Sequence, residues 1–599
     1  MEKLKAHLKK NYPIWIITSL SLTLYIASMI IVKTDTNFDY RWLAFWLHIA
    51  SILLLLNTYI SSFNLKTHFK KLFDKNEIDP IIFILIITVL ANFLLLSTYP
   101  YMSISDELRD GGLDTMKIAA GTLKNIFEYG SYDAHGLIIP TLTIPFYYLF
   151  GNSTLTYRFF AALLSSLDVI LLYLLIRQSI NKKTALWSAI ILTTLPLHMF
   201  FAHTQVVVTF NFFWVPVILL LLLNLLKRHN YIDYIFLGTI LGFTCGFHAA
   251  IRSFAILIFL LLLFLEFKNI ILKKIQNGEK ILTRLSKLAL LTCFIVVGFG
   301  PRLLFTEPHN FFHTSRFTLE NKIESQTPLT IDDLTNIKNN YIRSLMGYIY
   351  EPVGFFYQDQ KPLFPPFLAI FFILGIGYAL FVLKNYFINI LIFILITLPF
   401  LNSAITDSVN ADHRLSPLFS IASIFAAYGI TLCLGLLKHK WLNYLCIGII
   451  SLYLLNRAST FYLDQPANRN FLFQDNLSVH ALYTLRTNKQ LQNSPSAYLK
   501  NMNSSLPKIP VCMYVSPANY QYFNGNTGIE EQNQFLMPSA DIQYMRVNSI
   551  NDNEVYLVKG NCLNEIQQVI ATHTYRTSCA VDHTYSCPPE YKGDILIHY

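Results

Sequence analysis

Charged residues are scarce in this sequence of 599 residues, and their scarcity excludes several classes of protein. Asp, Glu, Lys and Arg make up 14% of the chain, against about 25% in soluble globular domains. A soluble enzyme and a disordered protein are therefore excluded. The net charge of +10 does not indicate nucleic-acid binding, because the basic residues are scattered through short loops instead of being gathered on one face.

Hydrophobic residues make up 53% of the chain, and apolar runs of about 17–25 residues recur through its first three quarters. That length is what a helix needs to cross a bilayer. We therefore predict a polytopic α-helical membrane protein with about 13 transmembrane helices. The predicted spans are residues 14–32, 42–60, 81–99, 159–177, 185–201, 207–226, 234–249, 251–267, 286–303, 366–383, 387–401, 417–437 and 441–456.

Basic residues in the loops predict the orientation. With the N-terminus in the cytoplasm, Lys and Arg are about three times denser in the inside loops than in the outside loops. An odd number of spans then places the C-terminus outside. The Met1–Val32 stretch begins basic and continues apolar, like a signal peptide. We interpret it as the first helix, because no convincing small-residue cleavage site follows.

Three predicted outside segments, residues 100–158, 302–365 and 457–599, are too long to be simple connectors, and long loops often carry function. In the last segment, Val511–Val515 and Val555–Val558 read as short strands, and Leu563–Ala571 reads as a short helix. We divide the chain into extra N-terminal helices (1–79), a transmembrane core (80–456) and a small extracytoplasmic α/β domain (457–599).

Four of the eight cysteines fall in this C-terminal domain: Cys512, Cys562, Cys579 and Cys587. Four cysteines in one small external domain favour two disulfides in an oxidising compartment, with three connectivities open. A zinc site is the alternative, although the sequence contains no CxxC pair.

An acidic pair, Asp106 and Glu107, comes just after the third predicted span. Acidic residues beside apolar spans are costly unless they face water, a partner or a substrate. An amphipathic segment follows over residues 114–127 and can lie flat on the membrane interface. The simpler interpretation is an ordinary solvated loop start or helix cap.

The order of motifs in and after this loop resembles a known superfamily. The acidic pair is followed by the segments Tyr132–Leu137 (YDAHGL), Pro140–Gly151 (PTLTIPFYYLFG) and Tyr157–Ser166 (YRFFAALLSS). This order is similar to the membrane-embedded C-type glycosyltransferases of the protein O-mannosyltransferase and lipid A aminoarabinose transferase superfamily. The resemblance covers roughly residues 80–260 and returns weakly at Asp412–Leu418 (DHRLSPL).

The resemblance implies a glycosyltransferase that takes a sugar from a polyprenyl-phosphate carrier on the extracytoplasmic face. Its acceptor would be a glycan, a lipid or a protein. Asp106 matches the catalytic carboxylate of the superfamily, and Glu107 matches the second acid of the pair. Residues 1–79 are then an addition to the usual arrangement, and 80–456 is the glycosyltransferase core. Many relatives have Lys-Pro-Pro or His-Pro-Pro where this chain has His135-Gly-Leu, which leaves the substrate contacts of that segment open.

Transfer at an anomeric carbon requires a base for the acceptor hydroxyl and cations for the departing phosphate. Asp106 is our hypothesis for the base. Arginine suits the phosphate because its planar fork binds two oxygens at once. Candidates at the outer ends of spans are Arg158, Arg252, Arg302 and Arg414; we rank Arg414 first and Arg252 second, while Arg158 can instead pair with the loop carboxylates. For each, the alternative is an arginine snorkelling at the interface.

Several histidines are predicted near the outer face, and we count His135, His203 and His413 as candidate substrate contacts. His309 and His313 are four residues apart, but the Phe-rich loop around them is not clearly helical, so we assign no metal site. The resemblance requires no cofactor, and a divalent ion near Asp106 remains an alternative.

Two other functions stay open. A lipid-linked glycan transporter or flippase should carry ionisable groups at mid-membrane depth and often internal repeats. This chain has Asp168 inside the fourth predicted span but few other deep charges and no convincing repeat. A glycan polymerase would share the topology and donor type. The short spans and external cysteines suit a bacterial inner membrane with the active site facing outward, and a eukaryotic reticulum membrane is the alternative.

Overall fold

The structure is a computed structural model. It describes residues 2–62, 75–96, 112, 114–121, 123–128, 136–151, 154–271, 281–306, 328, 330–357, 361–383, 385–405 and 409–463, and five short strands beyond residue 463.

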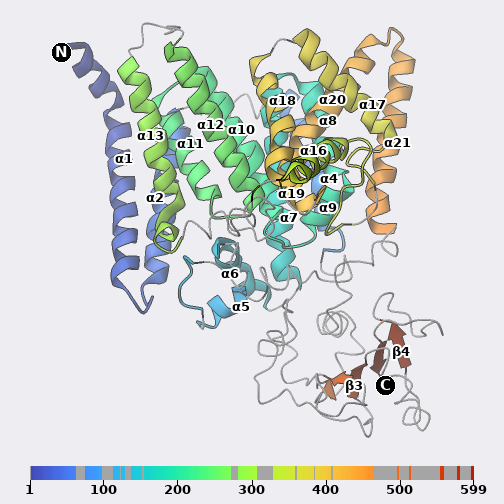
Figure 1. Cartoon of the computed structure of the whole chain (residues 1–599), viewed down its shortest axis with the longest axis horizontal. Coiled ribbons are helices and arrows are strands. Elements are labelled where there is room, and N and C mark those ends of the chain that lie inside the picture. Colours follow the sequence, from blue (N-terminus) through green and yellow to red (C-terminus); the bar gives the residue numbers. More distant parts are fainter. Residues whose placement is uncertain are drawn as a thin grey trace.

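The described chain is a bundle of long helices that run mostly parallel to one axis (Figure 1). The first half contains α1 (Glu2–Thr34), α2 (Arg41–Ser62), α4 (Lys75–Phe93), α5 (Asp114–Ala119), α6 (Ile138–Phe150), α7 (Thr154–Ser179), α8 (Lys182–Thr193), α9 (Pro196–Ala202), α10 (Thr209–Arg228), α11 (Tyr231–Thr244), α12 (Ala249–Ile271), α13 (Ile281–Phe299) and the 3₁₀ turn η3 (Gly300–Leu304). The second half contains α16 (Ile331–Met346), α17 (Pro366–Tyr378), η4 (Ala379–Leu383), α18 (Tyr386–Pro399), η5 (Phe400–Ala404), α19 (Asp412–Leu415), η6 (Ser416–Leu418), α20 (Phe419–Leu436) and α21 (Lys440–Leu463).

Ten helices of the described chain are long and apolar enough to cross a membrane, and the bent pair α8–α9 makes an eleventh candidate span. The prediction of a polytopic helical membrane protein is therefore confirmed. The number of thirteen is not, because two predicted spans, 81–99 and 234–249, correspond to shorter apolar helices, Ile78–Phe93 and Tyr231–Thr244. The first ends early because the backbone turns at Leu95, which has a positive φ of 57°.

The predicted span 185–201 is broken by 66° between α8 and α9. The break has a local cause. Pro196 opens α9, and Leu195 before it is extended, with ψ 117°. A proline supplies no amide hydrogen, and it disfavours helical geometry in the residue before it.

Two helix pairs in the bundle cross at glycines with their backbones in close contact. On α11, a β-carbon at Gly242 would overlap the carbonyl oxygen of Ile295 on α13, and one at Gly298 would overlap the carbonyl oxygen of Thr239. The pair α17–α20 uses Gly375 in the same way. Small residues at such crossings let membrane helices approach closely.

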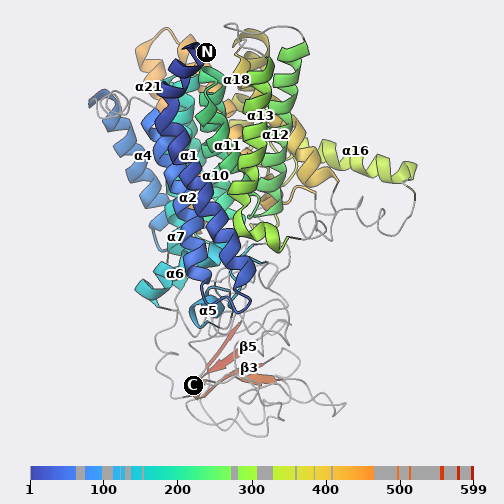
Figure 2. The same ribbon diagram turned by 90° about the vertical axis from the view of Figure 1, so that its left-hand side faces the viewer.

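The first long loop lies at the end of the bundle opposite the N-terminus, where α5 and α6 are found (Figures 1 and 2). The predicted amphipathic segment 114–127 is helical only over α5, which ends at Ala119. The chain then turns through Gly121, whose φ of 73° is left-handed. α16, in the 302–365 segment, projects sideways from the bundle (Figure 2).

Beyond residue 463 the structure describes five strands: β1 (Ser496–Ala497), β2 (Cys512–Tyr514), β3 (Glu554–Val558), β4 (Arg576–Cys579) and β5 (Ile595–His598). They pair in the order β1-β3-β5-β4, with β2 also beside β3. β2 and β3 coincide with the two predicted strands. The predicted helix Leu563–Ala571 and the thiols of Cys512, Cys562, Cys579 and Cys587 lie outside the described residues and side chains, so those predictions stay predictions.

Candidate functional site

The predicted catalytic pair, Asp106 and Glu107, lies outside the described residues, as does His135. The structure describes the chain up to Leu96 on one side of the acidic pair and α5 on the other. The role of these three residues therefore stays a prediction, and the site is built here from the residues around them.

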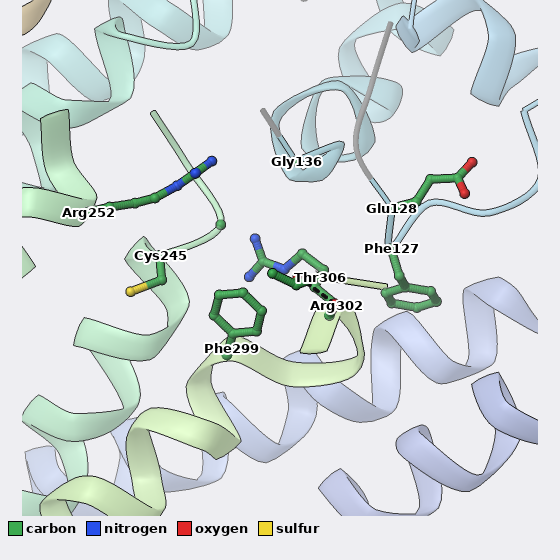
Figure 3. A pocket seen from close by; sticks show the side chains of 9 residues that line it. Phe127, Glu128, Gly136, Cys245, Arg252, Phe299, Arg302 and Thr306 are labelled. Atoms are coloured by element: carbon green, nitrogen blue, oxygen red, sulfur yellow. Dashed lines mark hydrogen bonds between the residues drawn. The ribbon is translucent and has the colours of Figure 1, made fainter. Parts of the chain in front are cut away.

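A pocket lies at the end of the bundle that carries the first long loop (Figure 3). Its lining residues come from that loop, from the turn between α11 and α12, and from the end of α13: Phe127, Glu128, Gly136, Cys245, Gly246, Arg252, Phe299, Arg302 and Thr306. The space among these side chains, counted together with solvent at its open side, is about 220 Å³. The pocket therefore brings together three segments that are distant in the sequence.

Arg302 is one of two cations that line this pocket. The turn η3 carries it, and its side chain is only 5% exposed. The guanidinium lies 5.6 Å and 5.7 Å from the ring centroids of Phe243 and Phe299, and Nη2 donates to the Phe243 carbonyl at 3.4 Å. Aromatic faces hold a cation without neutralising its charge. The charge of Arg302 is thus fixed in place beside the pocket.

Arg252 is the second cation, and it comes from the first turn of α12 (Figure 3). Its Nε donates to the carbonyl of Phe247 at 2.9 Å, and the side chain is 4% exposed. The two arginines therefore reach one small space from different helices. Two planar guanidinium groups at a shared space are suited to a phosphate, which offers several oxygens to paired N–H donors.

Glu128 is the carboxylate of the pocket, and the sequence reasoning missed it. Its Oε2 accepts a hydrogen bond from Asn125 Nδ2 at 3.0 Å. Partial burial raises the pKa of the Glu128 carboxyl, while the bond from Asn125 acts in the opposite direction. The available signal was an isolated acid in the otherwise apolar stretch Ile126–Glu128, at the end of the predicted amphipathic segment.

Arg414 and His413 are not among the described residues that line the pocket, but they contact the segment around α12 that carries Arg252. Arg414 Nε is 3.4 Å from His413 Nε2, and the His413 ring is 5.7 Å from that of His248. The amide of Asn402 donates to the carbonyls of Ala250, at 3.3 Å, and Arg414, at 3.1 Å. It thereby joins α19 to the turn of α12 that carries Arg252.

Asp412 has a structural task in this region. Its Oδ2 accepts hydrogen bonds from the backbone amides of Phe355, Phe356 and Tyr357 at 2.9–3.1 Å. A carboxylate that accepts several amides orders the segment that supplies them. The Phe355 ring in turn lies 4.7 Å from that of His413, so Asp412 fixes the surroundings of the two basic residues that follow it.

Arg158 and His203 lie together elsewhere, at the end of α4. Arg158 Nη1 donates to the carbonyl of Leu96 at 3.4 Å. The His203 ring nitrogens are 2.8 Å from the Met199 carbonyl and 3.1 Å from the Leu94 carbonyl. Both side chains are fully buried. They hold the last turn before the segment that carries the acidic pair.

Among the described residues, no group of three or more His, Cys, Asp or Glu side chains could hold a metal ion. His309 and His313 lie outside the described residues.

Comparison with known families identifies one region of the chain. Residues 134–298 match the family model described as dolichyl-phosphate-mannose-protein mannosyltransferase. The matched region overlaps the stretch in which the sequence resembles C-type glycosyltransferases, so that resemblance is confirmed. It includes Arg252 and ends just before Arg302. No curated protein matches the chain.

Comparison with solved structures finds membrane proteins at low sequence identity. One is ArnT from Cupriavidus metallidurans bound to undecaprenyl phosphate, with 12% identity, a TM-score of 0.43, and coverage of 86% of this chain and 97% of that one. Another is the Archaeoglobus fulgidus oligosaccharyltransferase in its apo form, with 15% identity, a TM-score of 0.43, and coverage of 71% of this chain and 59% of that one. A third is the archaeal oligosaccharyltransferase AglB from Archaeoglobus fulgidus, in complex with an inhibitory peptide and a dolichol-phosphate. It has 15% identity and a TM-score of 0.41, and the match covers 69% of this chain and 58% of that one.

Proposed function

We propose that this protein is a membrane glycosyltransferase that transfers a sugar from a polyprenyl-phosphate-linked donor to an acceptor on the extracytoplasmic side. The observation that carries the proposal is the convergence of Arg252 and Arg302 on one pocket at the ends of their helices. The match of residues 134–298 to a family named for a dolichyl-phosphate-mannose donor supports the same chemistry.

The two arginines would bind the phosphate of the donor. A departing phosphate gains negative charge as its bond to the sugar breaks, and preorganised cations stabilise that charge most when water is excluded. Arg252 and Arg302 are both buried to at least 95%. The phosphate would lie beside the two arginines, and the polyprenyl chain would extend from it into the membrane.

Asp106 would act as the general base. In a single displacement, the acceptor oxygen gives its proton to the carboxylate and forms a bond to the anomeric carbon. The bond from that carbon to the phosphate oxygen breaks, and polyprenyl phosphate leaves with the electron pair. Glu107 would orient the acceptor, and Arg158 with His203 would position the acidic pair by holding the end of α4.

The test follows release of free polyprenyl phosphate by the full-length protein, reconstituted in liposomes with extracts of polyprenyl-phosphate sugars. Asp106→Asn is expected to lower the release about a hundredfold or more by removing the base. Arg302→Gln is expected to weaken donor binding, whereas Arg343→Gln, an exposed arginine of α16 paired with Glu351, should leave release unchanged.

Transport of a lipid-linked glycan is the second candidate, and one contact favours it. His198 Nε2 lies 3.3 Å from Asp168 Oδ2, and both side chains are fully buried within the bundle. Ionisable residues at such depth often mark a transport pathway. If the wild type releases no polyprenyl phosphate while labelled lipid crosses the bilayer equally with and without Asp106→Asn, transport replaces transfer.

A further inference from the structure

The hairpin formed by α1 and α2 precedes the region that matches the family model. Such an addition could serve only to anchor the chain in the membrane. Its contacts indicate a second task, because they fall on two of the three segments that line the pocket: the first long loop and the end of α13. We infer that the α1–α2 hairpin is a wall of the site that positions Arg302 and Phe127.

The first contact is made by His48, in the second turn of α2. Its Nε2 lies 3.0 Å from the carbonyl oxygen of Val297, in the last turn of α13. Carbonyls in the last turn of a helix lack a partner within the helix, and a carbonyl can only accept, so His48 donates. The side chain of His48 is 4% exposed.

The imidazole of His48 also fills the space over Gly300. This glycine has a positive φ of 71°, and a β-carbon there would overlap the His48 ring. Gly300 begins the turn η3, which carries Arg302 two residues later. His48 therefore contacts Val297 at the end of α13 and Gly300 at the start of η3. These two contacts fix the direction in which η3 leaves α13.

His48 also lies against Phe243, one of the two aromatic rings that contact the Arg302 guanidinium. Its ring centroid lies 6.5 Å from that of Phe243, whose face and carbonyl both contact the guanidinium of Arg302. The path from the hairpin to the pocket cation is thus continuous. It runs from His48 through Phe243 to Arg302 on one side, and through Val297 and Gly300 on the other.

A separate apolar cluster joins the hairpin to the first long loop. Val32 of α1 and Phe45 of α2 belong to it, as do Ile118, Ile126 and Phe127 of the loop. Phe127 also lines the pocket. At the tip of the hairpin, the ring of Phe38 lies 5.9 Å from that of Phe305, which follows η3. The hairpin therefore contacts the pocket wall on two sides.

Hydrogen bonds between α1 and α2 make the hairpin suited to this task. Ser28 Oγ donates to the carbonyl of Ala44 at 2.7 Å, and Ser21 Oγ donates to that of Ser51 at 3.0 Å. Both serines are fully buried. These bonds fix the two helices against each other, so that a position set by α1 is transmitted to His48.

Cys245 provides a test that does not depend on the reaction. It lines the pocket, is 8% exposed and has a free thiol. The full-length protein in lipid nanodiscs is labelled with a small maleimide, and peptide mass mapping gives the labelling rate of Cys245. We expect His48→Ala and Phe45→Ala to raise that rate roughly threefold by loosening the wall. Leu53→Ala, a matched control on the exposed face of α2, should leave it unchanged.

Binding of undecaprenyl phosphate to the same samples measures the effect on the site, and this part rests on the proposed function. His48→Ala should raise the Kd about tenfold, the loss of one buried hydrogen bond, and His48→Gln, which keeps an N–H donor, should restore part of the affinity. If Cys245 labelling is equal in the wild type and all variants, the inference is wrong. If labelling changes as expected but the wild type does not bind the lipid, the inference about the hairpin is supported and the proposed function is contradicted. Should His48→Ala not purify as a monodisperse protein, Phe45→Ala and His48→Gln carry the test.

Discussion

The guanidinium group of Arg302 occupies the space that a side chain at Gly246 would fill. The glycine lies in the turn between α11 and α12, and the arginine lies in η3, more than fifty residues later. The three atoms nearest to a β-carbon there all belong to the guanidinium, the far end of a flexible side chain. A substitution at Gly246 should therefore act on the site more than on the fold.

Gly246→Ala is expected to displace the Arg302 guanidinium and to weaken binding of polyprenyl phosphate about tenfold, the loss of about one charge-assisted contact. The thermal midpoint should change little. Both are measured on purified protein in nanodiscs. Gly448→Ala on α21, where a β-carbon meets nothing within 4 Å, is the matched control. Unchanged affinity in Gly246→Ala would count against Arg302 as a phosphate ligand.

Gly242→Ala should have the opposite profile. Its β-carbon would overlap the backbone of Ile295, and a backbone cannot rotate away. Overpacking of this kind costs about 1–3 kcal/mol, so we expect a lower thermal midpoint and a smaller yield of monodisperse protein. Gly377→Ala on α17, which faces open space, should behave like the wild type. A normal midpoint in Gly242→Ala would mean that α11 and α13 are farther apart than described.

Asp412→Ala should disorder the segment that contains Phe355 and Phe356. Three backbone amides lose their shared acceptor, and each buried donor left without a partner costs about 1–3 kcal/mol. Limited proteolysis of the reconstituted protein should then cut near residue 355, where the wild type resists. Equal resistance in both proteins would show that the segment is held by other contacts.

Glu128→Gln tests the electrostatics of the pocket through pH. Because the pKa of Glu128 is raised above its ordinary value of 4.5, its charged form is disfavoured in the folded state. At low pH the carboxyl is neutral in both the folded and the unfolded chain, so it does not lower the free energy of unfolding. That free energy falls as the pH rises through the raised pKa, because the folded state must then hold a disfavoured charge. The variant should therefore match the wild type at pH 4 and exceed its thermal midpoint at pH 7–8. Equal midpoints across that range would contradict a raised pKa.

The strand register limits how the C-terminal cysteines can pair. Cys512 is opposite Val558, Val558 is opposite Ile595, and Ile595 is opposite Cys579. Three strand spacings place the two cysteines about 14 Å apart, beyond the roughly 7 Å that a disulfide allows. If two disulfides form, each of these cysteines must pair with Cys562 or Cys587. Non-reducing peptide mapping that finds Cys512 joined to Cys579 would refute the register.

The sequence predicts the helical spans well and the site only in part. Apolar runs determine the spans, and the errors occur where a local backbone feature intervenes, at Leu95 and Pro196. The pocket brings together three segments that are distant in the chain, so no local pattern places Arg302 beside Arg252. Glu128 was missed for the same reason, because an isolated acid in a loop gains meaning only from its neighbours.

The contact between His48 and Val297 joins residues separated by 249 positions. During synthesis, α1 and α2 enter the membrane long before α13 exists, and long-range contacts of this kind form late. The set of residues that line the pocket is therefore complete only after more than half of the chain has been made. A chain interrupted before α13 would hold the hairpin, the first loop and Arg252, but it would lack one wall and one of the two arginines of the site.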